Sequence, residues 1–382
     1  MLGNALSMAA TGREVVVVSG VEHNSPHSKL VAPGIHAIEV TERLPLHEPK
    51  WRHYANYPGM GCRTREWISL QKDQPEAIII YGGYFPYLMN LAAWARRRGI
   101  PVIFDAVEWY SANRWREFAV SPYLWSTEAA MRFLVPRVDG VLAISRALER
   151  HYSTRGMPVL RVPPLIDSAA WPMSSSAGKK SALTLCYAGS PGSKDLLDAI
   201  VAAVLAVDQG RCLLRLQIAG VDESEVRKIP AVAKHLISKG SKLPSCLAVH
   251  GRLSHADSMA LIGAAHFSVF LRLINRVSTF GFPTKFVESF VMGTPVIANL
   301  TSDLKDHLRD GENGLVCERA DQLSLEQTFQ RALEMSPDAL RRLRANARAE
   351  GVDAFDYSHH SARFDSFLTC LSGRALHARR TS

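Results

Sequence analysis

Short apolar runs alternate with stretches of helical periodicity along almost the whole of this 382-residue chain. One such unit consists of the run 77–81, a glycine pair, an apolar helical stretch over 86–98 and a second run over 102–104. A strand, loop, helix and strand in this order are typical of parallel sheets whose strands are joined by crossover helices. The alternation therefore predicts an α/β protein built on parallel sheets.

The same order recurs in the rest of the first half. It predicts strands over 15–18, 140–144 and 159–162, a helix over 128–135, and a helix capped by Ser145. Ahead of them, a helical stretch over 2–9 is stopped by Gly12. A doubly wound domain ordinarily begins with a strand and a glycine-bearing loop before its first helix. We therefore expect the first domain to lack its first strand, and residues upstream of Met1 to belong to the functional protein.

A second α/β series follows a stretch without apolar periodicity, Pro172 to Ser181, which contains three consecutive serines and two lysines. Strands are predicted over 183–187, 214–218, 247–250, 267–271 and 295–298. We expect an N-terminal Rossmann-like domain over 1–172, a linker over 173–181 and a C-terminal Rossmann-like domain over 182–350. A last helix over 354–371, within the segment 351–382, is expected to pack back on the first domain.

The composition indicates an ordinary globular protein with an anionic partner. Hydrophobic residues make up 47% and charged residues 21% of the chain, and no apolar run approaches the roughly 20 residues of a membrane span. The start lacks the pattern of a secretory signal and the six cysteines form no CxxC pair, so a cytoplasmic location with reduced thiols is expected. The net charge of +9 indicates nucleic acid, acidic lipid or a phosphorylated small molecule as the partner.

The most informative local pattern lies between Phe282 and Ala298. Pro283 suits a first helical turn, Gly293 a helix end, and Val296 begins a strand. The free amides at the start of this short helix would attract phosphate. Glu288, one turn further on, is placed to accept hydrogen bonds from the hydroxyls of a ribose. The alternative is an ordinary surface helix on which the side chains at 285 and 288 form an ion pair.

The sequence from Pro283 to Ser289, followed by 292–298, resembles the donor-site signature of the retaining glycosyltransferases of family 4, which have the GT-B fold. Segments 187–195, 218–220, 250–255 and 310–316 are similar to the same C-terminal domain and occur in the same order. The similarity is good over 183–317 and looser in the first half. It implies two Rossmann-like, doubly wound domains that face each other across a cleft.

The resemblance also implies roles for individual residues. Glu288 would bind the donor ribose, and Thr284 and Lys285 would face the diphosphate. Lys194 would neutralise the leaving nucleotide diphosphate, a role that suits the compact charge of a lysine. Gly189 and Pro283 complete the expected donor site.

Two positions depart from the family pattern. Ser190 stands where the family commonly has an arginine, and Phe280 stands where it commonly has a second acidic residue. Some polysaccharide-assembly members share the Pro-x-Lys-x-x-Glu variant, so the loss is interpreted as a subgroup trait. Arg272, after the strand at 267–271, could restore the missing positive charge, or it could be an arginine at the rim of the site. His250 and His255 lack partners for a metal site and are interpreted as structural.

In the first half, the segment 105–108 follows a strand at the edge where ligands of open α/β sheets bind. Family members often have a histidine in this segment, and Val107 replaces it. Glu108 could orient the acceptor or accept its proton, or it could cap a helix. The stretch from Arg114 to Leu134 is rich in aromatic and basic residues, as interfacial helices are. It could contact an anionic membrane that carries a lipid-linked acceptor, or it could be core.

The preferred hypothesis is a hexosyltransferase that moves a sugar from a nucleotide-diphosphate donor to an acceptor hydroxyl with retention. By resemblance it would act in bacterial surface polysaccharide or lipopolysaccharide biosynthesis, at the inner face of the cell membrane and without a metal or other cofactor. One alternative is a nucleotide-sugar epimerase of the same fold. The other is a basic nucleic-acid-binding protein, for which the sequence shows no recognition helix or zinc motif, so nucleic acid is not expected as a partner.

Overall fold

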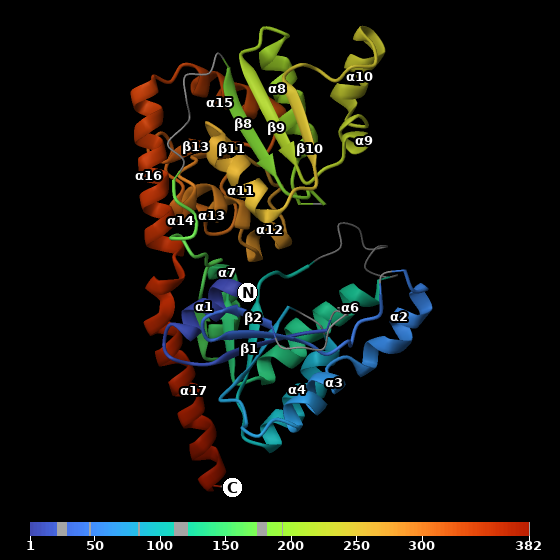
Figure 1. The fold of residues 1–382 in the computed structure, drawn as a ribbon, viewed down its shortest axis with the longest axis vertical. Coiled ribbons are helices and arrows are strands. Elements are labelled where there is room, and N and C mark those ends of the chain that lie inside the picture. The colour runs from blue at the N-terminus through green and yellow to red at the C-terminus, as the bar shows by residue number, and fades with distance from the viewer. Residues whose placement is uncertain are drawn as a thin grey trace. The chain divides into compact units, whose positions relative to one another are not determined.

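The structure is a computed structural model that describes residues 1–20, 29–45, 47–82, 85–110, 121–173, 182–192 and 194–381. The chain forms two compact units (Figure 1). Unit 1 comprises Met1–Leu165 and Tyr357–Ser382, and unit 2 comprises Ile166–Asp356. The chain thus enters unit 2 a few residues before the expected boundary at 172. The expected linker lies almost wholly outside the described residues.

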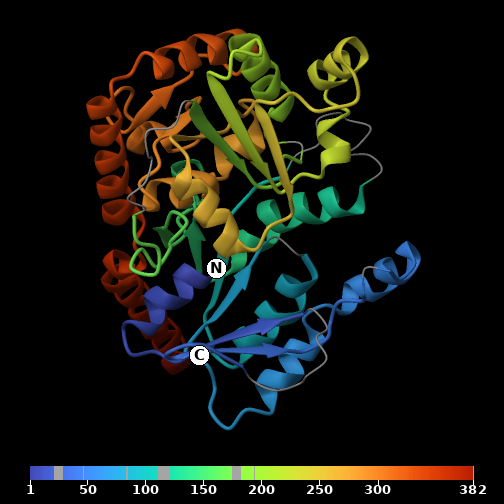
Figure 2. The same ribbon diagram turned by 45° about the horizontal axis from the view of Figure 1, so that its top comes forward.

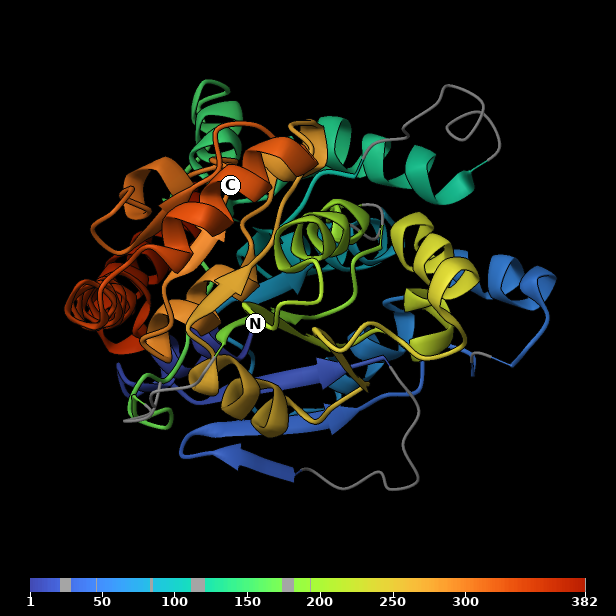
Figure 3. The same ribbon diagram turned by 90° about the horizontal axis from the view of Figure 1, so that it is seen from above.

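Unit 1 contains two sheets. The larger one has the order β4-β5-β6-β7, all parallel, from β4 (Ile78–Tyr81), β5 (Val102–Ala106), β6 (Gly140–Ala143) and β7 (Val159–Arg161). The smaller one has the order β1-β3-β2, from β1 (Val15–Ser19), β2 (Lys29–Ala32) and β3 (Ile35–Glu39), which Figure 3 shows side by side. β1 and β3 are parallel, whereas β2 and β3 are antiparallel. The sequence pattern did not predict β2 and β3.

The first and last helices of the chain pack together in unit 1. Helix α1 (Leu2–Ala9) contacts α17 (Ser361–Thr381) and the 3-10 turn η4 (Tyr357–His360) that precedes it. The Ser7 hydroxyl in α1 donates to the carbonyl oxygen of Tyr357 at 2.7 Å. Met8 from α1 and Phe364 from α17 are buried in one cluster with strand residues of the larger sheet. Burial of this apolar surface is the main reason that the C-terminal helix docks here.

Helices cover the other parts of unit 1. They are α2 (Lys50–Asn56), the short 3-10 turn η1 (Tyr57–Gly59), α3 (Cys62–Ser69), α4 (Phe85–Arg97), α6 (Pro122–Ala129), a π-helical turn η2 (Ala130–Leu134), a 3-10 turn η3 (Val135–Arg137) and α7 (Arg146–Ser153). The predicted helix over 128–135 is therefore the end of α6 and a π-turn. Ser145 caps α7 as predicted, since its hydroxyl accepts from the amide of Leu148.

Unit 2 is built on one six-stranded parallel sheet in the order β10-β9-β8-β11-β12-β13. Its strands are β8 (Leu183–Ala188), β9 (Leu214–Ala219), β10 (Leu247–Gly251), β11 (Phe267–Val269), β12 (Val296–Ala298) and β13 (Gly314–Val316). Leu185, Cys186 and Tyr187 of the central strand β8 are fully buried, as expected for a strand covered on both faces. All five predicted strands are confirmed, and β13 is an addition.

Helices flank this sheet, and Figure 2 shows those of unit 2 around strands β8 to β10. They are α8 (Leu197–Asp208), α9 (Glu223–Val226), α10 (Pro230–Lys239), α11 (His255–Ala264), α12 (Arg276–Phe280), α13 (Thr284–Val291), α14 (Leu304–His307), α15 (Gln322–Leu333) and α16 (Pro337–Phe355). None of the helices that the structure describes is long and apolar enough to cross a bilayer.

The predicted last helix, which was expected to run through 354–371, is interrupted. α16 ends at Phe355, and Asp356 has extended backbone angles (φ −67°, ψ 131°). Its carboxylate accepts from the amide of Ser168 at 3.0 Å and from the Ser168 hydroxyl, and these bonds favour the break over continued helix. A 3-10 turn η4 (Tyr357–His360) then leads into α17.

Candidate functional site

The topology of the sheet in unit 2 defines where a ligand is expected. From the central pair β8 and β11, the chain proceeds through β9 and β10 on one side and through β12 and β13 on the other. Open parallel sheets bind ligands beyond the carboxyl ends of the strands at such a reversal. The loops that follow β8 and β11 carry Lys194 and Arg272, which were proposed from the sequence, and Asp195, which was not.

A buried carboxylate joins these two loops to the start of α13. Asp195 Oδ1 lies 2.8 Å from Arg272 Nε, and Asp195 Oδ2 forms an ion pair with Lys285 Nζ. The Asp195 side chain is 1% exposed, and each of its two cationic partners is 12% exposed. Because two cations share one carboxylate, the cluster has one positive charge in excess.

The neighbouring residues fix the position of the Lys285 side chain. Its ammonium lies 3.9 Å from the centre of the Tyr187 ring, a cation–π contact. The Tyr187 hydroxyl donates to Asp195 Oδ2 at 2.9 Å. A Cβ at Gly189, which has φ +123°, would lie 2.6 Å from Lys285 Cε, so any other residue would be strained there and would displace the lysine side chain. Gly189 thus packs against Lys285, and its role in donor binding stays a prediction.

Arg272 is held by the backbone as well as by its ion pair. Its amide donates to Asn299 Oδ1 at 2.9 Å, and Asn299 Nδ2 donates to its carbonyl oxygen at 2.8 Å. Asn299 directly follows β12, so three strand ends contribute to the cluster. Arg272 therefore does not point freely to solvent, and its proposed contact with phosphate has to be made from within this ion-pair network.

Burial and the neighbouring charges shift the pKa values of Asp195 and Lys285 in opposite directions. Burial alone raises the pKa of Asp195, but the ion pairs with Lys285 and Arg272 outweigh it and lower that pKa below its ordinary value. Burial lowers the pKa of Lys285, and the attraction of Asp195 opposes this shift. The cluster is therefore held together by charge in a site from which water is largely excluded.

Helix α13 begins at Thr284, and Pro283 occupies its N-cap without any side-chain hydrogen bond to the helix. The first amides of a helix have no partner inside it, and they carry its partial positive charge. Thr284 is exposed and Pro283 is buried. The uncapped helix start therefore lies directly beside the ammonium-bearing residue Lys285.

Glu288 lies one turn further along α13 and contacts His255, a residue for which a structural role was expected. Its Oε1 lies 3.3 Å from Nε2 of His255, at the start of α11, and the Glu288 side chain is 28% exposed. The His255 ring packs edge-on against Trp171 with ring centres 5.3 Å apart. Burial raises the pKa of Glu288, and the attraction of His255 limits that shift. The alternative of an ion pair between Lys285 and Glu288 does not describe the site, because Lys285 pairs with Asp195.

Lys194 is half-buried in the turn that precedes α8, where its amide donates to the carbonyl oxygen of Pro191 at 3.1 Å. It is adjacent in sequence to Asp195, yet it is Lys285 and Arg272 that the carboxylate of Asp195 binds. The role of Lys194 at the leaving group stays a prediction.

The remaining predicted site residue lies in unit 1. Glu108 is half-buried just beyond the end of β5. Asp105, within β5, is 5% exposed and accepts a hydrogen bond from Asn4 Nδ2 at 3.0 Å. Burial raises the pKa of Asp105 to about 6. The first part of the aromatic and basic stretch, residues 114–120, lies outside the described residues.

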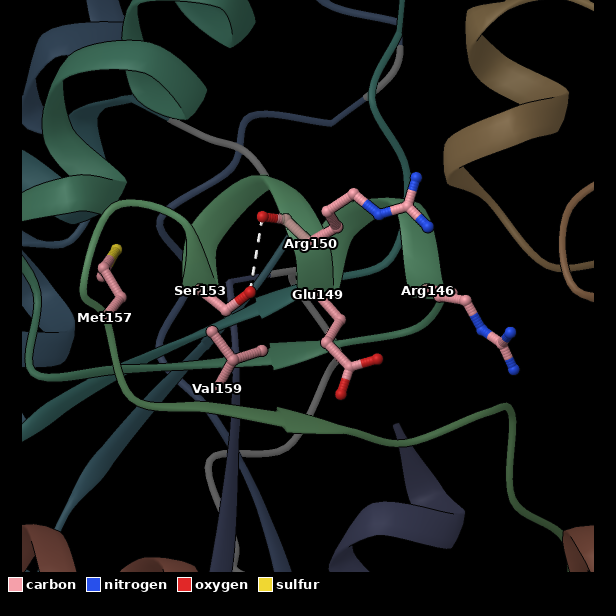
Figure 4. Close-up of a pocket in the computed structure, with 6 residues that line it drawn as sticks. All are labelled: Arg146, Glu149, Arg150, Ser153, Met157 and Val159. Atoms are coloured by element: carbon pink, nitrogen blue, oxygen red, sulfur yellow. Dashed lines mark hydrogen bonds between the residues drawn. The ribbon is translucent and has the colours of Figure 1, made fainter.

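Unit 1 also has a surface pocket of about 370 Å³ along α7, lined by Arg146, Glu149, Arg150, Ser153, Met157 and Val159. Figure 4 shows the side chains of Arg146 and Arg150 pointing in different directions, so they do not converge on one ligand. Glu149 is paired with Arg161 at 3.1 Å. The pocket therefore has none of the convergent polar groups that mark a binding site.

Sequence reasoning missed the central member of the site, Asp195, and the partner of Glu288, His255. The only signal for Asp195 was an acidic residue next to Lys194 in the loop after β8. Among the residues that the structure describes, no three His, Cys, Asp or Glu side chains are grouped so that they could hold a metal ion.

The two halves of the chain match two glycosyltransferase domains. Residues 1–164 match the model of the glycosyl transferase 4-like domain, and residues 183–335 match that of the glycosyl transferases group 1. With its two units built on parallel sheets, the chain is a glycosyltransferase of the GT-B fold.

Similar solved structures include a sucrose-phosphate synthase from Thermosynechococcus elongatus, with a TM-score of 0.74 and 18% identity over 98% of this chain and 92% of that one. Another is the Anabaena protein HepE in complex with UDP and glucose, with a TM-score of 0.66 and 14% identity over 96% of this chain and 95% of that one. A glycogen synthase of Mycobacterium tuberculosis is 24% identical over 50% of this chain. The match spans 44% of the length of that relative.

Proposed function

We propose that the protein transfers a sugar from a nucleotide-diphosphate donor to an acceptor hydroxyl, with retention of the anomeric configuration, in the manner of glycosyltransferase family 4. The observation that carries the proposal is the cluster of Asp195, Arg272 and Lys285 beside the uncapped start of α13. Its one excess positive charge and the free helix amides suit a diphosphate. Glu288, one turn away, suits the ribose of the same donor.

The chemistry of the step follows from these charges. The bond between the anomeric carbon and the diphosphate oxygen breaks, the acceptor oxygen bonds to that carbon on the same face, and the acceptor proton passes to the departing diphosphate. Negative charge develops on the diphosphate as the bond breaks, so Lys194, Lys285 and the start of α13 stabilise the transition state electrostatically. In this proposal no metal ion or cofactor takes part.

The acceptor is proposed to bind at unit 1, where Glu108 follows a strand at the carboxyl edge of the sheet. A half-buried carboxylate there can orient an acceptor hydroxyl. The acceptor is proposed to be a saccharide or a lipid-linked saccharide of a bacterial surface polysaccharide or lipopolysaccharide. The proposed location is the cytoplasm, at the inner face of the membrane.

The proposal is tested by calorimetric titration of the protein with a panel of nucleotide sugars. UDP-glucose comes first, because HepE, a protein similar in fold, has been solved in complex with UDP and glucose. Binding of one donor that is weakened by Lys285→Met and unaffected by Lys234→Met, at an exposed position of α10, supports the site. If no nucleotide sugar binds to the folded protein, the proposed function is wrong. The product of an active donor, analysed by NMR, then distinguishes retention from inversion.

A further inference from the structure

The pair of His255 and Glu288 joins two helices of unit 2 beside the donor site. His255 is the first residue of α11, Glu288 lies one turn into α13, and the two helices contact each other (Figure 1). The two residues are 33 positions apart in the sequence, so it is the fold that brings them together.

Protein groups occupy only half of the Glu288 carboxylate. Its Oε1 lies 3.3 Å from Nε2 of His255, whereas none of the residues that the structure describes forms a hydrogen bond with its Oε2. Because the side chain is 28% exposed, the free oxygen is open to a ligand. Each carboxylate oxygen can accept about two hydrogen bonds, so the contact with His255 leaves capacity for the hydroxyls of a ribose.

Trp171 restricts the His255 imidazole, although 60% of the histidine side chain is exposed. The two rings meet edge-on, with centres 5.3 Å apart and planes 87° apart. Trp171 packs in turn against the buried cluster that includes Met259 of α11. Its carbonyl oxygen accepts a hydrogen bond from Arg348 Nη1 at 2.9 Å. The ring and the backbone of Trp171 are therefore both fixed, and they limit the positions that the imidazole can take.

Arg348 of α16 connects this arrangement to the helix that carries Glu288. Its guanidinium donates to the carbonyl oxygen of Ser168 at 3.0 Å and to that of Val291, the last residue of α13. The same arginine thus holds the segment 168–171 and the end of α13. The carboxylate and the residues that support the imidazole therefore share one framework inside unit 2.

Charged groups surround the pair on each of these elements. Lys285 of α13 attracts the Glu288 carboxylate but is ion-paired with another residue. Asp257 lies in the first turn of α11, where its carboxylate accepts from the hydroxyl that caps the helix. Asp167 accepts from amides of its own turn. Within the described part of the chain, His255 is therefore the only residue that forms a hydrogen bond with the carboxylate of Glu288.

On the basis of the proposed function, in which Glu288 binds the donor ribose, we propose that His255 is a positioning residue that holds Oε1 of Glu288 in place and leaves Oε2 for the ribose hydroxyls. A glutamate side chain is flexible, and binding costs less entropy when a partner has already restricted it. Burial raises the pKa of Glu288, and the attraction of His255 opposes this shift. Loss of His255 therefore favours the protonated carboxyl, a weaker acceptor.

The first test is calorimetric titration with UDP-glucose, or with whichever nucleotide sugar of the panel binds, at neutral pH. His255→Leu removes the hydrogen-bond donor at similar size, so affinity should fall roughly two- to fivefold, as for a partly exposed ion pair. His255→Gln can donate an N–H to the same oxygen and should restore most of the loss. His235→Leu, at a half-buried position of α10, is the matched control and should bind as the wild type does.

A double variant distinguishes positioning from direct contact with the donor. If His255 acts through Glu288, His255→Leu should have little further effect in the background of Glu288→Gln. Losses that add in the double variant would overturn the proposal. On acidification, His255→Leu should also lose affinity at a higher pH than the wild type, because Glu288 is protonated more readily without the histidine. A purely structural effect of His255 would leave the pH of this decline unchanged.

A measurement without donor separates this proposal from the proposed function. NMR of glutamate-labelled protein follows the Glu288 carboxyl carbon as the pH is lowered, and Glu288→Gln identifies its signal. The carboxyl should titrate at a higher pH in His255→Leu than in the wild type or in His235→Leu. Equal titration in all three proteins would overturn the proposal, whether or not a donor binds. A raised value in His255→Leu, with no nucleotide sugar bound by the wild type, would uphold His255 as the positioning residue of Glu288 and refute the proposed function instead.

Discussion

Asp195 in the loop after β8 forms an ion pair with Lys285 in the first turn of α13, although 90 positions separate them in the sequence. Asp195 also binds Arg272, so one carboxylate connects the loops after β8 and β11 with the start of α13. This ion-pair network is present in a chain that has Ser190 and Phe280 where an arginine and an acidic residue were expected.

The first prediction is that Asp195→Asn destabilises the protein. Removal of the buried charge leaves Lys285 and Arg272 close together without a shared partner, and breaking a buried pair in this way costs about 3 to 5 kcal/mol. The measurement is the free energy of unfolding in urea. Asp198→Asn, at an exposed position in the first turn of α8, is the control and should cost less than about 1 kcal/mol.

The pH dependence of this difference follows from the lowered pKa of Asp195. A carboxyl whose pKa is lower in the folded state stabilises the fold above its unfolded pKa, about 4, and this contribution is lost as the pH falls through the folded value. The difference in the free energy of unfolding between wild type and Asp195→Asn should therefore be largest at neutral pH and shrink below pH 4. The same difference at neutral pH and below pH 4 would show that the charge of Asp195 does not cause it.

Glu288→Gln is predicted to weaken donor binding by about 1 to 3 kcal/mol without loss of the fold, because a charged acceptor of the ribose hydroxyls is replaced by a neutral one. Calorimetric titration with the donor measures this change. Glu312→Gln, which alters an exposed glutamate in the same unit, should bind as the wild type does.

The raised pKa of Glu288 adds a pH signature. Because burial favours the protonated form, Glu288 loses its charge at a higher pH than an ordinary glutamate as the solution is acidified. Donor affinity of the wild type and of Glu312→Gln should therefore decline together on acidification, and Glu288→Gln should lack that part of the decline. Parallel curves for all three proteins would contradict the assignment to the ribose.

Lys194→Ala is predicted to lower kcat more than it raises KM. A cation that neutralises the leaving diphosphate acts mainly in the transition state, where the negative charge develops. Steady-state kinetics with the preferred donor measure both constants, and Lys228→Ala at an exposed position provides the comparison. A change in KM alone would limit Lys194 to positioning the donor, and unchanged kinetics would remove it from the site.

The sequence was sufficient to predict the parallel sheets because each strand is a short apolar run bounded by glycine or by a helix of clear periodicity. The five predicted strands of unit 2 are such runs. Strands β2 and β3 were not predicted because the segment 29–39 mixes polar and apolar residues without strict alternation. Helix limits were less predictable where a tertiary contact decides them, as at Asp356, whose carboxylate binds Ser168 from 188 positions away.

The site was predictable only where its residues form a local pattern. Pro283 to Glu288 is one continuous helix start, so spacing alone brings these residues together. The contact of Asp195 with Lys285 depends on the order of strands in the sheet, which periodicity does not encode. The interpretation of His255 as structural failed to anticipate its contact with Glu288 for the same reason.

The last prediction concerns Asp105 in β5 of unit 1. Burial raises its pKa to about 6, so the folded state binds the proton more tightly than the unfolded chain does, where the value is 3.8. The contribution of this carboxyl group to the free energy of unfolding falls as the pH rises from about 4 to about 6 and stays low above pH 6. Asp105→Asn removes the ionisation and can keep the hydrogen bond with Asn4. The variant should therefore be more stable than the wild type at pH 7 by roughly 1 to 3 kcal/mol, and about equally stable at pH 4.

Thermal and urea unfolding at pH 4 and pH 7 measure this difference in stability. Asp139→Asn is the matched control. The Asp139 carboxylate accepts a hydrogen bond from the amide of Val102 at 2.8 Å, so this variant should lose stability. Destabilisation of Asp105→Asn at both pH values would show that its carboxylate is needed for the fold. If the variant gains stability and loses turnover, the buried charge near Glu108, the residue proposed to orient the acceptor, is kept at a cost to the fold because the reaction uses it, as is common at functional sites.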